Sequence, residues 1–348
     1  MINVGERAGI LKWLREEDNA RLEQLWAEAD EVRRENVGDE VHLRGLIEIS
    51  NYCCRQCGYC GIRAGNDTVE RYRMTAGEIL ECARQAVKYK YGTVVMQAGE
   101  DYGIETDWLA EIVRRIKRET PLAVTLSLGE RPDNDLAAWK EAGADRYLLR
   151  FETSDQELYE LIHPKFGGGF KNRLAVLDVL RKLGYEVGSG VMVGIPGQTY
   201  ETLAGDIETF RSLDLDMIGV GPYISHPATP LGAGEWKRNI PPAEQAPNTE
   251  LMTYKTVALT RLVCPQANIP STTALATINK TNGRELGLTR GANIVMPNLT
   301  PVKYRALYEI YPAKACIDET SGQCRSCLYA RINSIGRTVG KGQGSRKR

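Results

Sequence analysis

Short apolar segments alternate with longer amphipathic segments along most of this chain. The apolar runs are nearly continuous, as expected for strands that are buried on both faces of a parallel sheet. We expect strands at residues 46–49, 93–96, 123–128, 146–151, 188–195, 217–223, 269–273 and 293–296. Helical periodicity predicts helices between them, of which the clearest cover 76–88, 108–118, 172–183, 200–213 and 251–262. Residues 6–35 also have the pattern of charged amphipathic helices.

Eight strand–helix units without a second compositional block favour an α/β fold, namely a complete (βα)8 barrel of the TIM type. A barrel of this kind commonly needs about 250 residues, and the chain has 348. We therefore expect an N-terminal helical segment at 1–36, the barrel at 37–312, and a C-terminal cysteine-containing extension at 313–348. The basic, glycine-rich end at 340–348 is predicted to be flexible.

Charge and cysteine content limit the classes of function that this chain can have. Lys+Arg and Asp+Glu both number 45, so no global field favours nucleic acid or an anionic membrane. No apolar signal segment opens the chain, and no window approaches the roughly 18 consecutive apolar residues that a membrane-spanning helix needs. Of the nine cysteines, seven lie in two tight groups, which is typical of metal ligands rather than of a disulfide scaffold. We expect a cytoplasmic protein that binds neither nucleic acid nor membranes.

The most informative motif is formed by Cys53, Cys57 and Cys60, a C-x3-C-x2-C spacing with Tyr59 before the last cysteine. Iron–sulfur clusters are held by thiolates, and three local ligands would leave one iron of a 4Fe-4S cluster open. The motif resembles the signature of the radical S-adenosylmethionine (SAM) superfamily. The resemblance implies that the open iron binds SAM, and that an electron from the cluster cleaves SAM to a 5′-deoxyadenosyl radical. Tyr59 is then a candidate to pack on the adenine.

Two other metal sites fit the motif less well. A zinc site usually has four ligands in paired dyads, so its fourth ligand would have to come from far away in the chain. A ferredoxin pattern that starts at Cys54 would need a further cysteine at position 64, where the chain has Ala64. Cys54 is therefore expected to be a bystander, and a swap of register between Cys53 and Cys54 stays open.

Polar residues and glycines recur where the predicted strands end, and barrel enzymes have their active sites at these C-terminal strand ends. Gly99 before Glu100 allows the backbone to approach a ligand closely, which suits the ammonium group of SAM. Glu152 is a candidate for the ribose hydroxyls, with a structural ion pair to Arg150 as the alternative. Arg173, near the start of a helix, is a candidate for the SAM carboxylate, with a surface position as the alternative.

A second group of cysteines, Cys316, Cys324 and Cys327, lies near the C-terminus with C-x7-C-x2-C spacing. Three thiolates this close, among Gly and Ser residues, predict an accessory iron–sulfur site. A zinc site with a distant fourth ligand and free, easily oxidised thiols are the alternatives.

Several segments together resemble the HydE family of FeFe-hydrogenase maturases. The resemblance runs from about residue 30 to the end of the chain and includes the spacing of the C-terminal cysteines. The segments that carry it are EISN at 48–51, RYRMT at 71–75, VTLSLGE at 124–130, GADRYLLR at 143–150, VGIPGQT at 193–199 and IVMPN at 294–298.

This resemblance implies a radical SAM enzyme that acts in hydrogenase active-site maturation, on a cysteine-bearing iron complex with carbon monoxide and cyanide. It also implies a second iron–sulfur cluster and a small-molecule or organometallic substrate. The implied partners are other hydrogenase maturation proteins and an electron donor such as a ferredoxin or flavodoxin. The implied substrate cavity is lined by Arg150, Met217, Thr273, Met296, Tyr308 and Tyr311.

Two departures from the family pattern concern this cavity. Ala98 stands where the family often has Ser, and Phe151 replaces a His that the family can show. Both changes are expected to make the cavity less polar, which puts the substrate in question. The alternatives are a lysine mutase like methylornithine synthase, or an enzyme like biotin synthase. A non-catalytic iron–sulfur electron carrier is the alternative of another class, and the C-terminal cysteine trio favours the maturase.

Overall fold

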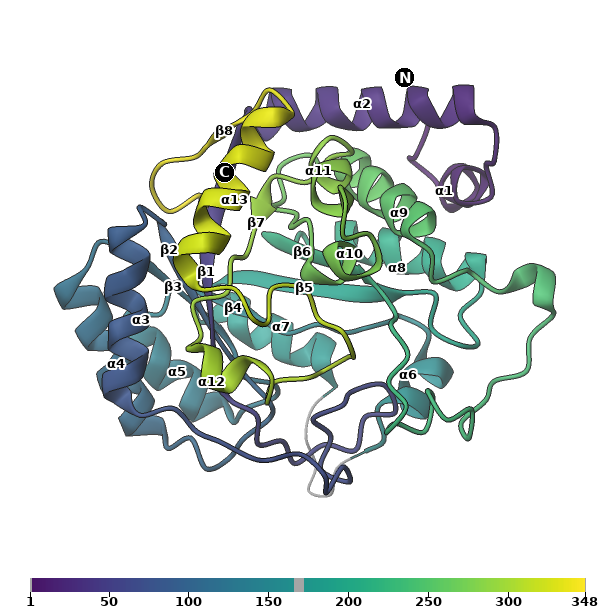
Figure 1. The fold of residues 1–348 in the computed structure, drawn as a ribbon. Coiled ribbons are helices and arrows are strands. Elements are labelled where there is room, and N and C mark those ends of the chain that lie inside the picture. The colour runs from purple at the N-terminus through teal and green to yellow at the C-terminus, as the bar shows by residue number, and fades with distance from the viewer. Residues whose placement is uncertain (1, 166–171, 348) are drawn as a thin grey trace.

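The computed structural model describes residues 2–165 and 172–347, and its strands form one parallel sheet. The strand order is β6-β5-β4-β3-β2-β1-β7, and β8 pairs with the start of β1 (Figure 1). The predicted α/β fold with parallel strands is therefore confirmed. The strands are β1 (Glu40–Ser50), β2 (Thr93–Ala98), β3 (Ala123–Ser127), β4 (Arg146–Leu148), β5 (Glu186–Val193), β6 (Met217–Pro222), β7 (Ile294–Val295) and β8 (Thr338–Val339).

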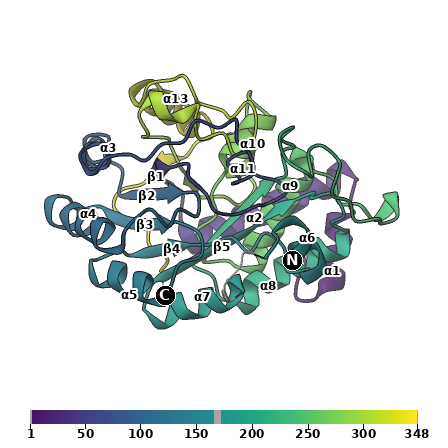
Figure 2. The same ribbon diagram turned by 90° about the horizontal axis from the view of Figure 1, so that it is seen from below.

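Helices follow the strands and cover the outside of the sheet. Figures 1 and 2 show α3, α4, α5, α7 and α8 in succession around the strands, while α1 and α2 pack beside α8 and α9. Thr75 and Thr199 cap α3 and α8 through their side chains, as such N-terminal positions require. The helices are α1 (Arg7–Leu14), α2 (Asn19–Val37), α3 (Ala76–Lys88), α4 (Thr106–Glu119), α5 (Asp133–Glu141), α6 (Gln156–Ile162), α7 (Arg173–Lys182), α8 (Tyr200–Ser212), α9 (Glu250–Val263), α10 (Thr273–Ile278), α11 (Gly283–Leu288), α12 (Val302–Arg305) and α13 (Ser321–Ser334), with a 3-10 turn η1 (Pro242–Glu244).

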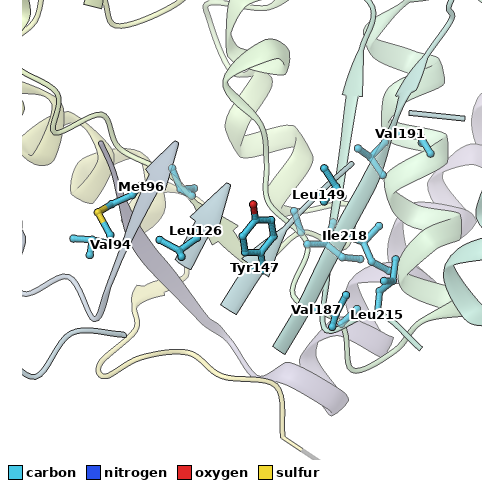
Figure 3. Packing of buried hydrophobic residues seen from close by; sticks show 14 of the residues in the cluster. Val94, Met96, Leu126, Tyr147, Leu149, Val187, Val191, Leu215 and Ile218 are labelled. Carbon is cyan, nitrogen blue, oxygen red and sulfur yellow. The ribbon is translucent and has the colours of Figure 1, made fainter. Parts of the chain in front are cut away.

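The side chains of β2 alternate between a hydrophobic layer and an inner cavity. Val94 and Met96 of β2 belong to the buried cluster that includes helix residues such as Leu109, and Figure 3 shows both with Leu126 and Tyr147. The alternate residues of β2, Val95 and Gln97, border the cavity instead. Since the side-chain period of a strand is two, the inner face of the sheet is free to carry polar chemistry.

The segment between α9 and α10 differs from the prediction. The expected strand at 269–273 is wrong, because α10 already begins at Thr273 and only isolated parallel bridges join Met217 to Asn268 and Pro270 to Ile294. Pro270 has no N–H to donate to a neighbouring strand. The Ile269 N–H donates to the side-chain oxygen of Asn293 at 2.9 Å. A side chain thus replaces part of the backbone pairing between β6 and β7.

The C-terminal end, predicted to be flexible, is instead bound across the N-terminal ends of the strands. Beyond β8, the Gly340 N–H donates to the Val41 carbonyl at 2.9 Å. The Gln343 carbonyl accepts from Thr93 Oγ1 at 3.0 Å and from Arg146 Nη2 at 3.1 Å. Residues 340–346 are called the floor strap below, and Arg348, the last residue of the expected tail, lies outside the described residues.

Buried arginine and glycine residues explain why the floor strap is ordered. The Gly344 carbonyl accepts from Arg44 Nη2 and from Asn268 Nδ2, both at 3.0 Å. A Cβ on Gly92 would lie 1.6 Å from the Gly342 carbonyl oxygen, so only glycine allows this close passage of two backbones. The glycine content that suggested flexibility therefore serves tight packing.

Deleting residues 341–348 is expected to destabilise the fold. The deletion leaves donors of the buried Arg44 and Arg146 without their carbonyl partners, which costs roughly 3 kcal/mol of unfolding free energy. Urea denaturation of the full and shortened chains measures the difference, and the Lys341→Ala, Lys347→Ala variant is the control for lost charge. Equal midpoints for the full and shortened chains would contradict a bound floor strap.

In the part of the chain that the structure describes, none of the helices combines the length and apolar character needed to cross a membrane.

Candidate active site

The residues that the sequence singled out in the barrel segment all border one cavity of about 340 Å³ inside the curved sheet. They come from the loop after β1, from the residues that follow β2 and β4, from the first residues of β6, α7 and α10, and from the segments after β7 and α12. The roles assigned to them stay predictions, but their grouping is a fact of the fold. They are Cys53, Cys57, Tyr59, Cys60, Gly99, Glu100, Arg150, Glu152, Arg173, Met217, Thr273, Met296, Tyr308 and Tyr311.

The cysteine loop is held against the strand ends by its backbone. The Cys54 N–H donates to the Glu100 carbonyl at 3.0 Å, and the Gly58 N–H donates to the Ile162 carbonyl at 2.8 Å. A Cβ on Gly99 would lie 2.2 Å from the Tyr52 carbonyl oxygen, so glycine is required where β2 ends against the loop. The loop therefore has a fixed path across the mouth of the cavity.

Arg71 organises the same loop from outside the cysteine motif. Its guanidinium donates to the carbonyls of Asn51, Ile62, Arg63 and Asn66 at distances between 2.6 and 3.1 Å. Four carbonyls gathered on one cation fix the turn through the cysteines. Sequence reasoning used Arg71 only as part of a family segment and missed this role.

The three predicted cluster thiols face the cavity, whereas Cys54 does not border it. Burial raises the pKa of Cys53, of Cys57 and, to about 12, of Cys60, so the thiols are protonated in the free chain. Burial and the Glu100 carboxylate raise the pKa of Cys54 to about 12 as well. Three thiols around one cavity are the donor set that a cluster with one open iron requires.

No three His, Cys, Asp or Glu side chains in residues 2–165 and 172–347 already lie close enough together to share a single metal ion. A four-iron cluster spreads its thiolates over separate irons, so its ligands do not meet at one point.

A buried network of two arginines and two glutamates lies under the cysteine loop. Arg55 Nε donates to Glu100 Oε1 at 2.6 Å, and Arg55 Nη2 lies 2.6 Å from Glu130 Oε2. Arg173 Nε donates to Glu130 Oε1 at 3.0 Å. All four side chains are buried, so the charges stabilise one another in a medium that screens them weakly. Sequence reasoning missed Arg55 and Glu130, although Glu130 ends a predicted strand.

Glu152 is the candidate ribose ligand and has an uncommon backbone conformation. Its φ is +64°, a left-handed conformation that costs energy for a non-glycine residue and that the surrounding structure must hold in place. Its Oε2 atom is buried, has no well-directed hydrogen bond to any residue that the structure describes, and lies 3.2 Å from Arg150 Nη2. The ion pair with Arg150 thus exists, and a carboxylate oxygen with spare accepting capacity still faces the cavity, which fits a hydroxyl-bearing ligand.

His163 lies behind Arg173 and was not among the predicted site residues. Its Nε2 atom is 2.6 Å from Arg173 Nη2, and its Nδ1 atom is 3.2 Å from the Tyr159 hydroxyl. Burial, reinforced by the charges of Arg173 and Arg55, lowers the pKa of His163 from 6.5 to about 2. The imidazole is therefore neutral at any physiological pH.

The low pKa of His163 predicts a pH dependence of stability. Below about pH 6.5 the unfolded chain binds a proton at His163 that the folded chain does not, so unfolding becomes easier as pH falls. His163→Gln is expected to flatten the profile by up to about 1.4 kcal/mol per pH unit. Urea denaturation of the metal-free protein at about pH 5 and about pH 7.5 measures this slope. Parallel profiles for the two proteins would contradict a neutral His163.

The deeper part of the cavity combines thioethers, phenols and one buried ion pair. Gln97 Nε2 donates to the Tyr308 hydroxyl at 3.2 Å, and burial raises the pKa of Tyr308 and of Tyr311, so both phenols stay neutral. Lys314 pairs with Glu48 beside them, and Asn298 donates to the same carboxylate at 3.0 Å. Sequence reasoning missed this ion pair, which joins β1 to the C-terminal segment.

The two departures from the family pattern have different consequences. Ala98 borders the cavity, as expected. Phe151 does not: its ring packs against Phe210 in the hydrophobic core, with centroids 5.6 Å apart. The expectation that Phe151 makes the cavity less polar is therefore wrong, because the side chain after Arg150 points to the opposite face of the sheet.

The C-terminal cysteines Cys316, Cys324 and Cys327 border a second cavity of about 770 Å³ between α11 and α13. Arg284 Nη2 lies 3.7 Å from Cys316 Sγ, and Arg331 Nε lies 3.3 Å from Cys327 Sγ. A hydrogen bond from Cys324 and the charge of Arg284 lower the pKa of Cys316 to about 6. The fold thus brings the three thiols to one cationic cavity.

Comparison with known proteins identifies the family of this chain. Residues 47–210 match the family model of the Radical SAM superfamily. A 3-methylornithine synthase from Methanosarcina acetivorans is 31% identical over 281 residues, which cover 80% of this chain and 75% of that protein. The crystal structure of methylornithine synthase (PylB) has a TM-score of 0.80 and 25% identity, and covers 97% of this chain and 94% of that one.

The cysteine loop, the parallel fold and these matches define a radical SAM enzyme. The FeFe hydrogenase maturase subunit HydE of Thermotoga maritima is 47% identical over 331 residues, which cover 95% of this chain and 91% of that protein. The chain therefore belongs to the HydE family within the radical SAM superfamily.

Proposed function

We propose that this protein acts in the maturation of the FeFe-hydrogenase active site, on a cysteine-bearing iron complex that carries carbon monoxide and cyanide. The observation that carries the proposal is one cavity bordered by three cysteine thiols and by Arg150, in a chain 47% identical to a HydE. A bound cluster and SAM would supply a carbon-centred radical there.

The residues at the cavity mouth suit the cofactor. Cys53, Cys57 and Cys60 would hold the cluster. The backbone at Gly99 and Glu100 would take the SAM ammonium group, and Tyr59 would pack on the adenine. Glu152, with its spare carboxylate oxygen, would accept from ribose hydroxyls, and Arg173 would hold the carboxylate.

The inner residues suit a compact, polar metal complex. The Arg150 guanidinium and the Thr273 hydroxyl offer donors to cyanide and to a carboxylate. Met217 and Met296 provide soft, apolar surface, and neutral phenols of Tyr308 and Tyr311 can donate hydrogen bonds without accepting a proton.

Finer features belong to the same proposal. The bridges from Met217 to Asn268 and from Pro270 to Ile294 support a complete eight-fold barrel. The cationic cavity at Cys316, Cys324 and Cys327 supports a second iron–sulfur cluster. The proposed domain organisation is an N-terminal helical segment at 1–36, a barrel at 37–312 and a C-terminal cysteine-containing extension at 313–348. A ferredoxin or flavodoxin as electron donor, other maturation proteins as partners and a cytoplasmic location complete the proposal.

Substrate-dependent turnover tests the proposal. Reconstituted protein is mixed under argon with SAM, dithionite and a synthetic iron–cysteine complex bearing carbon monoxide and cyanide. We expect the rate of 5′-deoxyadenosine formation to rise at least about tenfold over the rate without the complex. No stimulation by the complex would contradict the proposed substrate.

Lysine is the second candidate substrate, because methylornithine synthase shares the fold at 97% coverage of this chain. The same assay with lysine separates the two. Stimulation by lysine alone, with formation of methylornithine, would replace the maturation role by the mutase role.

A further inference from the structure

Three of the five N–H donors of Arg173 are fixed by the protein. Nε donates to Glu130 Oε1 at 3.0 Å, Nη1 donates to the Arg150 carbonyl at 2.6 Å, and Nη2 lies 2.6 Å from His163 Nε2. An arginine carries one hydrogen on Nε and two on each Nη atom. Among the residues that the structure describes, one hydrogen on each Nη atom is left without an acceptor, and Arg173 borders the cavity.

The ring of His163 is held rigidly in its place after α6. It stacks on Tyr159 with ring centroids 5.1 Å apart and an interplanar angle of 21°, and the backbone N–H of His163 donates to the Tyr159 carbonyl at 2.8 Å. Because Nε2 accepts from Arg173, the neutral imidazole carries its proton on Nδ1, which donates to the Tyr159 hydroxyl.

A neutral acceptor has a particular value beside this arginine. Arg173 already faces the carboxylates of Glu130 and, at 3.9 Å, Glu152. A third carboxylate in place of His163 would fix the guanidinium equally well but would cancel its attraction for an anion. An uncharged imidazole orients the Arg173 guanidinium without neutralising its positive charge. That charge can then attract an anion in the cavity.

We propose that His163 is a positioning residue that aims the guanidinium of Arg173 at the carboxylate of a ligand in the cavity. The proposal rests on the proposed function, in which Arg173 holds the carboxylate of SAM. It assigns to His163 a contribution to carboxylate binding through Arg173, without direct contact with the ligand.

Equilibrium binding to the oxidised, cluster-loaded protein tests the proposal without turnover. Calorimetry gives the Kd of SAM and of decarboxylated SAM, which lacks only the carboxylate. His163→Leu removes the acceptor at similar size and is expected to raise the Kd of SAM about tenfold. The Kd of decarboxylated SAM is expected to change less than about twofold. His163→Gln, which keeps an acceptor, should restore most of the affinity, and the exposed Glu160→Gln on α6 is the control.

Each other outcome has one meaning. If His163→Leu weakens both ligands equally, or neither, the positioning role is wrong. Arg173→Ala separates this failure from that of the proposed function. If Arg173→Ala leaves the Kd of SAM unchanged, the assignment of Arg173 itself fails. If Arg173→Ala weakens SAM and His163→Leu does not, only the inference about His163 fails.

Discussion

Replacing Cys53 with serine is expected to abolish the cleavage of SAM, whereas replacing Cys54 with serine leaves the rate within about threefold of wild type. Cys53 borders the cavity together with Cys57 and Cys60, and a hydroxyl is a poor ligand for cluster iron. Cys54 lies 3.9 Å from a carboxylate oxygen of Glu100, whose charge opposes the thiolate form.

The measurement is 5′-deoxyadenosine formed per reconstituted protein, together with iron content. Cys264 lies far from the cavity, at the C-terminal end of α9. The Cys264→Ser variant therefore controls for the loss of any thiol. An active Cys53→Ser variant and an inactive Cys54→Ser variant would show that the ligand register is shifted by one residue.

Replacing Arg55 with alanine is expected to lower the free energy of unfolding by about 3–5 kcal/mol. The change removes the cation between Glu100 and Glu130 and leaves two buried carboxylates without it. The cysteine loop should also lose its fixed position, because Arg55 lies between Cys53 and Cys57. We therefore expect less iron to be retained after reconstitution.

Urea denaturation of the metal-free protein measures this effect separately from cluster binding. Arg84→Ala on α3 is the matched control, since its ion pairs with Glu81 and Glu119 are exposed and contribute under about 1 kcal/mol. An Arg55→Ala variant as stable as Arg84→Ala would contradict the buried network.

Local patterns explain which parts of the fold and site were predictable. The cysteine loop is a contiguous motif, and the parallel strands β2, β3 and β5 are short apolar runs, so both are visible in one stretch of sequence. Because parallel strands end at the same edge of a sheet, the residues that follow them were expected to meet, and Gly99 and Glu152 do border one cavity.

Interactions between distant segments explain the rest. The ion pair of Arg55 with Glu130 joins residues 75 positions apart, and Lys314 meets Glu48 across most of the chain. Nothing near Arg44 in the sequence indicates that its partner is the Gly344 carbonyl. The prediction for 340–346 was wrong for the same reason, because local composition does not reveal contacts with distant segments. A composition typical of flexible ends is here the composition of a tightly packed strap.

The most direct test is EPR of the anaerobically reconstituted, dithionite-reduced protein with and without SAM. We expect a reduced 4Fe-4S signal that changes on addition of SAM, because the cofactor would bind the iron left open by Cys53, Cys57 and Cys60. A signal that is identical with and without SAM, in protein shown to carry its cluster, would contradict the account and favour an electron carrier.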